Sequence, residues 1–332
     1  MDPLSDVLSL LKPRNQLFAA FDTAGAWSFS FPPYDGIKFA AVLQGGCWGV
    51  VTGMDRPVRL EEGDCFLLNS GYEIVLSSDL SLPPQDSSAI MDAIARDGIA
   101  VHNGGGEVLL IGGFFTFSSE HAALLLDAFP PFARPPRSSN QADVLRWSLD
   151  QLKSELRDPM PGGALVSNHL LHLMLVQVLR LHMTASSADS PAGWLTGLSD
   201  RRIRAAISAM HAEPARHWSL DELARIAGLS RTIFAQRFKR LVGETTMSYL
   251  MRWRMLMATD RLRRSDESIT SISFALGYES ESAFCTAFKR AMSCSPTQYR
   301  RRSSASSEEA NEEVPTWIRA TAKHDLEISD DD

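Results

Sequence analysis

The sequence predicts an α+β protein of two domains: an amino-terminal β-barrel followed by a helical hairpin, and a carboxy-terminal all-α domain with two helix-turn-helix units. Three observations support this prediction. Short apolar runs separated by glycines occupy residues 17–117. Apolar residues then recur at helical spacing from residue 140 onward. The basic segment at 201–302 contains an internal repeat with an offset of fifty residues.

The composition is that of a soluble chain with room for two domains. The chain has 332 residues, of which 44% are hydrophobic and 22% are charged. No window offers the ~18 uninterrupted apolar residues of a membrane span. Residues 1–12 lack the basic leader and the cleavage site of a signal peptide. The four cysteines are too scattered for a disulfide framework. We therefore expect a cytoplasmic protein without a membrane partner.

The first part of the chain has the pattern of a small antiparallel barrel or sandwich. Glycine turns separate short apolar runs at Ile37–Leu43, Trp48–Val51, Cys65–Leu68 and Ile74–Leu76. Leu82–Gly98 is polar and predicts a loop with some helix. Val108–Phe117 predicts a late strand, with a bulge at Gly112–Gly113.

Two apolar helices are expected next. Leucines recur at helical spacing over 144–156, and a more apolar helix is predicted at 164–183 after the turn Pro161–Gly163. One face of this hairpin would cover the barrel and another would meet a second subunit, so we expect a homodimer. Residues 1–183 would then form the first domain, and the small, polar segment 184–199 would be a linker.

The charges divide the chain into three parts. Residues 1–200 carry 12 basic and 22 acidic side chains, residues 201–302 carry 19 and 9, and residues 303–332 carry 2 and 9. A basic block in an acidic protein indicates a polyanionic partner, although a solvated basic surface has the same composition. The acidic tail at 303–332 is low in apolar residues and is predicted to be disordered.

The basic block contains two copies of one pattern. Each copy reads as a helix, a glycine turn and a helix capped by serine, and the matched positions are Leu223, Gly228, Ser230, Phe234, Phe238, Lys239 and Arg240 with Ile272, Gly277, Ser280, Phe284, Phe288, Lys289 and Arg290. In the first copy, Ser219–Glu222 predicts a capping box and Gly228 the left-handed residue that ends the helix. This is the outline of a helix-turn-helix, whose second helix can lie in the DNA major groove.

The outward faces of the two second helices form the predicted DNA-binding face. Its residues are Arg231, Thr232, Ala235, Gln236, Lys239 and Arg240 in the first copy and Glu281, Ser282, Cys285, Thr286, Lys289 and Arg290 in the second. Early positions would meet base edges, whereas the lysines and arginines would meet phosphates. Met247–Arg264 predicts a connecting helix of roughly 27 Å, on the order of one duplex turn.

The block at 200–302 resembles the AraC/XylS family of bacterial transcriptional regulators. The resemblance rests on the signature segments Ala275–Tyr278, Ala287–Arg290 and Ser295–Arg300. It implies a domain of seven helices, with two helix-turn-helix units joined by a long helix, and sequence-specific binding of double-stranded DNA. The family usually has an arginine where this chain has Thr286, so a bidentate arginine contact to guanine is not expected there. Ser293 replaces a family glycine.

The first 183 residues look like the cupin-type sensor domain of one AraC subgroup. The supporting segments are Leu43–Trp48, Val58–Asp64 and Leu67–Gly71. The resemblance implies a regulator that responds to a ligand or a state, with a small-molecule effector and RNA polymerase as further partners. The effector-binding residues, the operator, and the choice between activator and repressor stay open.

Two alternative functions would need different residues or behaviour. A metal-dependent cupin enzyme with an accessory DNA-binding domain needs clustered histidines, but the barrel region holds only His102 and His121. We therefore expect no catalytic residue, no metal and no cofactor. A protein scaffold is the other alternative, and weak dependence of binding on salt would favour it. Cys47 and Cys65 are interpreted as core residues, with redox sensing as the alternative.

Overall fold

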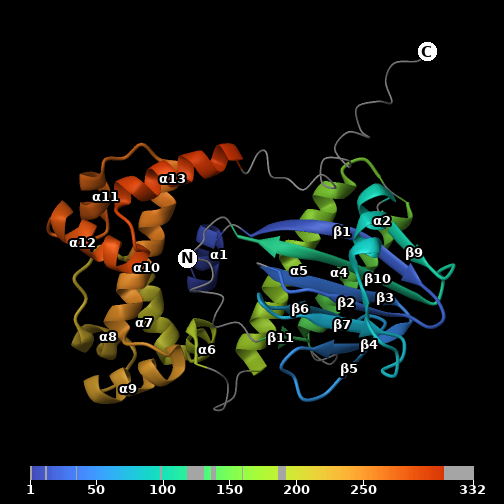
Figure 1. Ribbon diagram of the computed structural model, residues 1–332. Coiled ribbons are helices and arrows are strands. Elements are labelled where there is room, and N and C mark those ends of the chain that lie inside the picture. Colours follow the sequence, from blue (N-terminus) through green and yellow to red (C-terminus); the bar gives the residue numbers. More distant parts are fainter. Residues whose placement is uncertain are drawn as a thin grey trace. The chain divides into compact units, whose positions relative to one another are not determined.

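The structure is a computed structural model that describes residues 2–11, 13–34, 36–97, 99–117, 131–135, 140–158, 160–185 and 192–309. The described chain divides into two compact units, and each is considered by itself (Figure 1). One unit contains two β-sheets with helices α2, α4 and α5. The other contains helix α1 and helices α6 to α13.

The sheet-containing unit has two packed sheets instead of the predicted closed barrel. Within the described residues, one sheet has the strand order β11-β6-β3-β10-β1-β9 and the other has β5-β4-β7-β2-β8. No strand is shared between the sheets, so the edges β11, β9, β5 and β8 remain, and the barrel prediction was wrong in this respect. The strands are β1 Arg14–Thr23, β2 Ser28–Phe31, β3 Ile37–Gln44, β4 Gly46–Val51, β5 Val58–Glu61, β6 Cys65–Leu68, β7 Ile74–Ser77, β8 Gln85–Asp86, β9 Ile99–His102, β10 Val108–Thr116 and β11 Phe132–Ala133.

The larger sheet turns alternate residues of β3 and β10 toward the smaller sheet. Three opposed pairs on this inner face are Lys38 with Phe114, Ala40 with Gly112, and Val42 with Leu110. The core between the sheets contains residues of both, including Val42, Leu110, Phe29, Ile74 and Leu76. The predicted bulge at Gly112–Gly113 is absent on the β3 side, where both glycines pair regularly and the register shifts between Leu109 and Leu110. On the β1 side, the register shifts between Phe18, which pairs with Gly112, and Ala20, so the irregularity next to Gly112 lies in β1.

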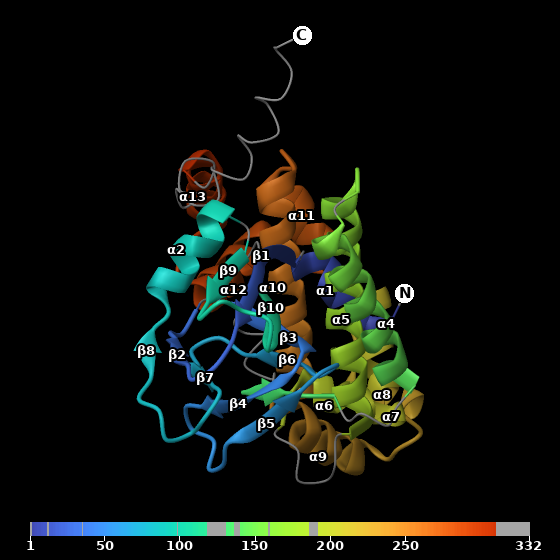
Figure 2. The same ribbon diagram turned by 90° about the vertical axis from the view of Figure 1, so that its right-hand side faces the viewer.

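Helices α4, Asn140–Arg157, and α5, Gly163–Ala185, form the predicted hairpin (Figure 2). A ring nitrogen of His172 on α5 lies 2.7 Å from the carbonyl oxygen of Pro13, next to β1. Among the described residues, α5 is the one helix with the length and apolar composition of a membrane span, and half of that window is buried within the fold. A core helix of a soluble protein has the same composition. The expected loop before β9 contains helix α2, Ser88–Asp97.

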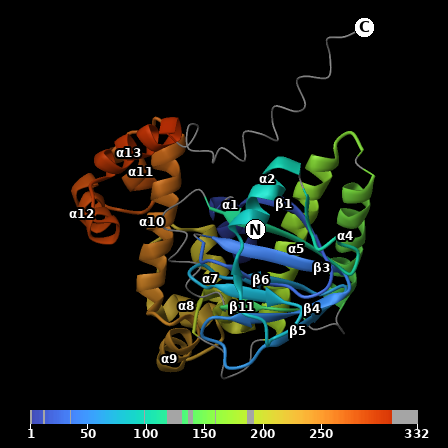
Figure 3. The ribbon, with the colours of Figure 1, turned by 45° about the vertical axis from the view of Figure 1, so that its right-hand side comes forward.

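The second unit is helical. Its described helices are α1 Pro3–Leu11, α6 Trp194–Ser199, α7 Arg201–Ala212, α8 Leu220–Ile226, α9 Arg231–Val242, α10 Thr246–Arg264, α11 Ile269–Ala275, α12 Glu281–Met292 and α13 Pro296–Glu309. Helices α8 and α9 lie at one end of the long helix α10, and α11 and α12 lie at the other (Figure 3).

Three boundaries differ from those expected. Helix α1, assigned to the first domain by sequence, buries Leu4, Val7 and Leu11 and packs on α7 and α10. The end of the expected linker 184–199 forms α6, because Trp194 and its neighbours bury apolar side chains against α7 and α9. Helix α13 extends to Glu309, so 303–309 are helical. The rest of the predicted tail, 310–332, lies outside the described residues.

A buried histidine connects three helices of this unit. His211 on α7 stacks on Trp253 of α10 with ring centroids 3.7 Å apart. Its Nε2 atom lies 2.9 Å from the hydroxyl of Tyr249, and its Nδ1 atom lies 3.3 Å from a carboxylate oxygen of Asp6 on α1. Burial lowers the pKa of His211 from 6.5 to about 3. The imidazole is therefore neutral in the folded protein at neutral pH.

This histidine predicts a loss of stability in mild acid. In the unfolded chain His211 takes up a proton as the pH falls below 6.5, whereas the folded protein excludes that proton. Unfolding thus becomes more favourable by up to about 1.4 kcal/mol per pH unit between pH 6.5 and about 5, above the range in which carboxylates titrate. Urea unfolding at several pH values measures this slope. His211→Gln should make it shallower and leave the contribution of His182, whose pKa burial also lowers. An equal slope in that variant would contradict the assignment.

Candidate DNA-binding interface

The first helix-turn-helix unit is formed by local signals in its sequence. The Ser219 hydroxyl accepts a hydrogen bond from the Glu222 backbone N–H, and the Glu222 carboxylate accepts one from the Ser219 backbone N–H. This confirms the predicted capping box at the start of α8. Gly228 has a φ of 63°, as the predicted left-handed turn requires. Ser230 precedes α9 in extended conformation but its side chain makes no capping hydrogen bond, unlike the prediction.

The second unit repeats this construction. Gly277 has a φ of 78°, and the Ser280 hydroxyl accepts a hydrogen bond of 3.2 Å from the backbone N–H of Ala283. Ser293 ends α12 in the left-handed region with a φ of 58°, where the first unit has Gly243. A serine in this conformation is less favourable than a glycine, so the end of α12 is the more strained of the two.

Helices α9 and α12 are equivalent residue by residue. Over 231–240 and 281–290 the sequence of exposed, half-buried and buried positions is identical. Phe234 and Phe238 are fully buried, and so are Phe284 and Phe288. The two ring centroids lie 5.7 Å apart in the first pair and 5.6 Å apart in the second. The repeat seen in the sequence is therefore a repeat of packing, with one helix face inside and the other in solvent.

The twelve residues of the predicted face lie on the outward side of these helices. Ten are exposed: Arg231, Thr232, Gln236, Lys239, Arg240, Glu281, Ser282, Thr286, Lys289 and Arg290. Ala235 and Cys285 occupy equivalent positions and are half-buried. Burial, and then the nearby Glu281, raises the pKa of the Cys285 thiol, so this cysteine is not an activated thiolate.

Several outward side chains are held by neighbours. An Arg231 guanidinium nitrogen lies 3.3 Å from an Asp221 carboxylate oxygen of α8. The Thr286 hydroxyl donates a 2.9 Å hydrogen bond to the carbonyl of Ser282, one turn earlier on α12. The hydroxyl of Thr270 donates to the Glu281 carboxylate, which joins α11 to α12. Glu281 thus has a structural contact and adds a negative charge to this face.

The connecting helix has the predicted extent. Helix α10 has 19 residues and a length of about 28 Å. Thr245 caps it, since its hydroxyl accepts a hydrogen bond from the Ser248 backbone N–H. The guanidinium of Arg290 on α12 lies 3.1 Å from the sulfur of Met251 on α10. Helices α9 and α12 are therefore both attached to the long helix α10.

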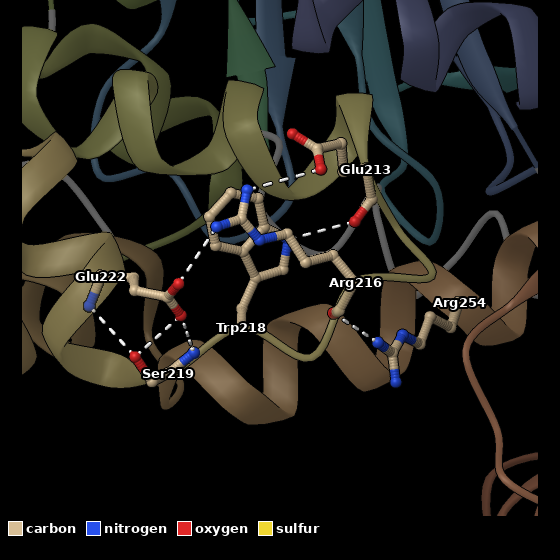
Figure 4. Close-up of polar contacts among 6 residues, drawn as sticks. All are labelled: Glu213, Arg216, Trp218, Ser219, Glu222 and Arg254. Carbon is tan, nitrogen blue, oxygen red and sulfur yellow. Dashed lines mark hydrogen bonds and ion pairs between the residues drawn. The ribbon is translucent and has the colours of Figure 1, made fainter.

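The segment 213–218, which carries no sequence motif, connects the two helix-turn-helix units within the helical unit. The Arg216 guanidinium lies 4.1 Å from the centre of the Trp218 ring and pairs with Glu222 at 3.0 Å (Figure 4). The indole N–H of Trp218 donates a 3.1 Å hydrogen bond to the carbonyl of Glu213. The capped start of α8 is thus fixed to the segment 213–218 that precedes it.

The same segment contacts the connecting helix and the second unit. Arg254 of α10 donates hydrogen bonds to the carbonyls of Pro214 and Arg216, at 2.7 and 3.0 Å (Figure 4 shows the second). A side chain on Gly277 would begin 2.1 Å from the carbonyl oxygen of Ala215. The turn of the second unit therefore lies directly against this segment. Arg254 is one of five arginines in α10, so the sequence does not single it out.

Histidines and cysteines are the residues on which metal or redox chemistry would depend. Within the described residues, no group of three or more His, Cys, Asp or Glu side chains is placed to hold a metal ion. His121 lies outside the described residues. Cys47 and Cys65 are buried, and burial raises the pKa of each thiol to about 12. Such thiols are poor nucleophiles.

Two family models match the chain. A model described as cupin matches residues 2–184, and a model described as a helix-turn-helix domain matches residues 223–302. The first covers the sheet-containing unit together with α1, and the second covers most of both helix-turn-helix units.

Known transcription regulators align with most of this chain. An AraC-like transcription regulator of Streptomyces antibioticus is 40% identical over 301 residues, which are 91% of this chain and 99% of that protein. The regulator AlkR of Acinetobacter baylyi is 29% identical over 91% of this chain and all of its own length. A solved DNA-binding domain of AdpA, in complex with a target DNA, is 28% identical and covers 30% of this chain and 90% of its own, with a TM-score of 0.29. The chain therefore belongs to the AraC-like transcription regulators, with an amino-terminal cupin domain and a carboxy-terminal helix-turn-helix DNA-binding domain.

Proposed function

We propose that α9 and α12 are two reading helices that enter neighbouring stretches of the DNA major groove. The main support is the identical pattern of exposure on the two helices, with a basic pair at the same place in each, Lys239–Arg240 and Lys289–Arg290. Among the described residues, no ion pair involves these four side chains, so their charges are available to phosphates.

Within this proposal the outward residues divide into two roles. The uncharged side chains early on the outward faces, Thr232 and Gln236 on α9 and Ser282 and Thr286 on α12, read base edges. An amide such as that of Gln236 can recognise adenine through two hydrogen bonds. The lysines and arginines bind phosphates and set the register of the protein on the duplex.

The two roles predict different results in a competition assay. Gln236→Ala or Thr286→Ala should relax the preference at one base pair and change binding to unrelated duplexes little. Lys289→Ala should weaken binding to all duplexes to a similar extent and lower the salt slope by about one. Arg56→Ala, at an exposed turn of the other unit, is the control for loss of a positive charge. If the glutamine and lysine variants behave alike, the assignment of the groove face is wrong.

The amino-terminal unit is proposed to make the regulator responsive to a ligand and to join two copies of the chain. Large apolar side chains are exposed on the hairpin, namely Trp147 on α4 and Leu165 and Val166 on α5. A homodimer through α4 and α5 would cover them and would place two DNA-binding domains on repeated half-sites. The protein would act in the cytoplasm, beside RNA polymerase at the promoters that it binds, without any enzymatic activity of its own.

Mapping the sites bound across the genome, followed by affinity measurements on those duplexes at increasing salt, tests the proposal. Several phosphate contacts predict a linear fall of log affinity against log salt, with a slope of several units. Binding that is indifferent to salt would favour the protein scaffold instead. Turnover by the purified chain would favour the enzyme.

A further inference from the structure

One arginine of the long helix α10 lies where the two helix-turn-helix units meet. Arg254 is near the middle of α10 and is half-buried. Its Nε–H donates a 2.7 Å hydrogen bond to the carbonyl of Pro214, and a terminal N–H donates a 3.0 Å hydrogen bond to the carbonyl of Arg216. Its guanidinium carbon also lies 5.8 Å from the centre of the Tyr278 ring. This side chain thus contacts both the segment that precedes the first helix-turn-helix unit and the turn of the second.

The hydrogen bond to Arg216 connects Arg254 to the first helix-turn-helix unit (Figure 4). The guanidinium of Arg216 lies over the Trp218 ring and pairs with Glu222 at 3.0 Å. Glu222 belongs to the capping box that begins α8, and α8 packs on α9. A displacement of the Arg216 backbone would therefore be passed to α8 and to the reading helix α9.

The contact with Tyr278 connects the same arginine to the second helix-turn-helix unit. The Tyr278 ring packs edge-on against Phe284, with ring centroids 5.4 Å apart. Phe284 is fully buried and belongs to the first turn of the reading helix α12. Tyr278 also follows Gly277 directly, and a Cβ at Gly277 would lie 2.1 Å from the carbonyl oxygen of Ala215. The position of α12 is therefore coupled to that of the segment before α8.

The contacts of Arg254 described above are with neutral groups, two carbonyls and one ring. Among the described residues, no carboxylate lies within ion-pair distance of its guanidinium. Burial lowers the pKa of Arg254, because the charged group loses hydration there. An apolar side chain of similar volume would avoid that cost. A planar guanidinium, however, holds two acceptors and a ring face in one fixed arrangement, which the flexible ammonium of lysine does not reproduce.

We propose that Arg254 is a positioning residue, which fixes the spacing between α9 and α12 and thereby the distance between the two DNA segments that the chain recognises. The inference rests on the proposed reading of one duplex by both helices. Successive base pairs are about 3.4 Å apart and rotated by about 35°, so a rigid pair of helices meets both segments at one spacing. A pair that is free to move loses affinity at that spacing, because ordering it costs free energy, and it tolerates neighbouring spacings better.

Affinities of the full chain for a set of duplexes test this proposal. The set is built on a site recovered from its genome, and it contains the natural spacing, spacings with one base pair inserted or removed, and a duplex with one segment randomised. The unaltered chain should prefer the natural spacing about tenfold or more. Arg254→Met should lower the affinity at the natural spacing about tenfold, since two hydrogen bonds from a charged group are lost. It should change the affinities for the other duplexes little, so that the preference for the natural spacing largely disappears.

Three further substitutions separate the geometry of this contact from its charge and from the stability of the fold. Arg254→Lys keeps the positive charge but cannot hold both carbonyls, so it should narrow the preference as Arg254→Met does. Arg264→Met removes another guanidinium of α10, which pairs with Asp260 one turn earlier, and it should leave the preference unchanged. If Arg254→Met does not fold, Arg216→Ala decides. This substitution removes a partly exposed side chain, releases α8 from the segment before it, and should also narrow the preference.

The spacing series shows which statement fails if the expected result is not found. Equal losses on all duplexes in Arg254→Met, which a purely structural role would produce, would overturn the proposal. An unchanged preference for the natural spacing in Arg254→Met or in Arg254→Lys would do the same. An unaltered chain that binds all spacings equally would instead refute the proposed reading of one duplex by both helices.

Discussion

Phe288→Ala is expected to unfold the second helix-turn-helix unit. The ring is fully buried, with its centroid 5.6 Å from that of Phe284 and 5.7 Å from that of Tyr299. Removing such a side chain costs about 3–5 kcal/mol, because apolar contacts are lost and a cavity remains. That loss is a large fraction of the ~5–15 kcal/mol by which folded domains are stable. Urea unfolding followed by circular dichroism measures the loss, and sequence-specific DNA binding should disappear with it.

A phenylalanine in the same unit provides the control. Phe274 on α11 is 57% exposed, so Phe274→Ala should change the free energy of unfolding by no more than ~0.5 kcal/mol. Outward and inward phenylalanines must differ in this way if the two copies share one pattern of packing. A loss below about 1 kcal/mol for Phe288→Ala would mean that the second unit is not built around this ring.

Gly277→Ala is expected to be the most damaging change of a single methyl group in the helical unit. An L-residue in the left-handed region costs about 1–2 kcal/mol. The new Cβ would also begin 2.1 Å from the carbonyl oxygen of Ala215, which is backbone and cannot turn aside. The segment 213–218 must therefore move. This movement would disturb the hydrogen bonds from Arg254 that connect the segment to α10. Both stability and DNA affinity should fall.

The equivalent glycine in the first copy of the repeat separates the cost of the left-handed conformation from the cost of the contact with Ala215. Gly228 has a similar φ of 63°, but nothing lies within 4 Å of the Cβ that an alanine would add there. Gly228→Ala should show the conformational cost alone, about 1–2 kcal/mol. Thermal or urea unfolding of the two variants gives the difference. Equal losses would show that the contact with Ala215 does not constrain the second unit.

The repeat could be predicted from the sequence because its signals are local. Capping serines, left-handed glycines and phenylalanines spaced four apart act within one or two helical turns, so Gly228, Gly277, Phe234 and Phe284 were placed correctly. The outward residues followed from the same spacing, since a helix that buries one face must expose the other. Ser230 differs because the N-cap preference allows, but does not compel, a side-chain hydrogen bond.

Features that depend on distant contacts could not be predicted in this way. Helix α1 belongs to the helical unit because Asp6 meets His211, 205 residues later in the chain. Arg254 is placed by carbonyls of a loop some forty residues earlier, and no pattern around it shows this. A cavity between the two sheets, with Ala40 and Gly112 among its lining residues, likewise depends on the register that pairs these two residues. In all three cases, the deciding partner is set by the tertiary fold.

The central claim is that α9 and α12, at the two ends of α10, read two neighbouring segments of one duplex. Hydroxyl-radical footprinting of the full chain on a site recovered from its genome tests this directly. The account predicts pairs of protected patches on one side of the duplex, with centres about one helical turn, or 10 base pairs, apart, and with Gln236→Ala and Thr286→Ala each affecting a different patch. A single patch for each bound domain, or patches that respond equally to both substitutions, would contradict it.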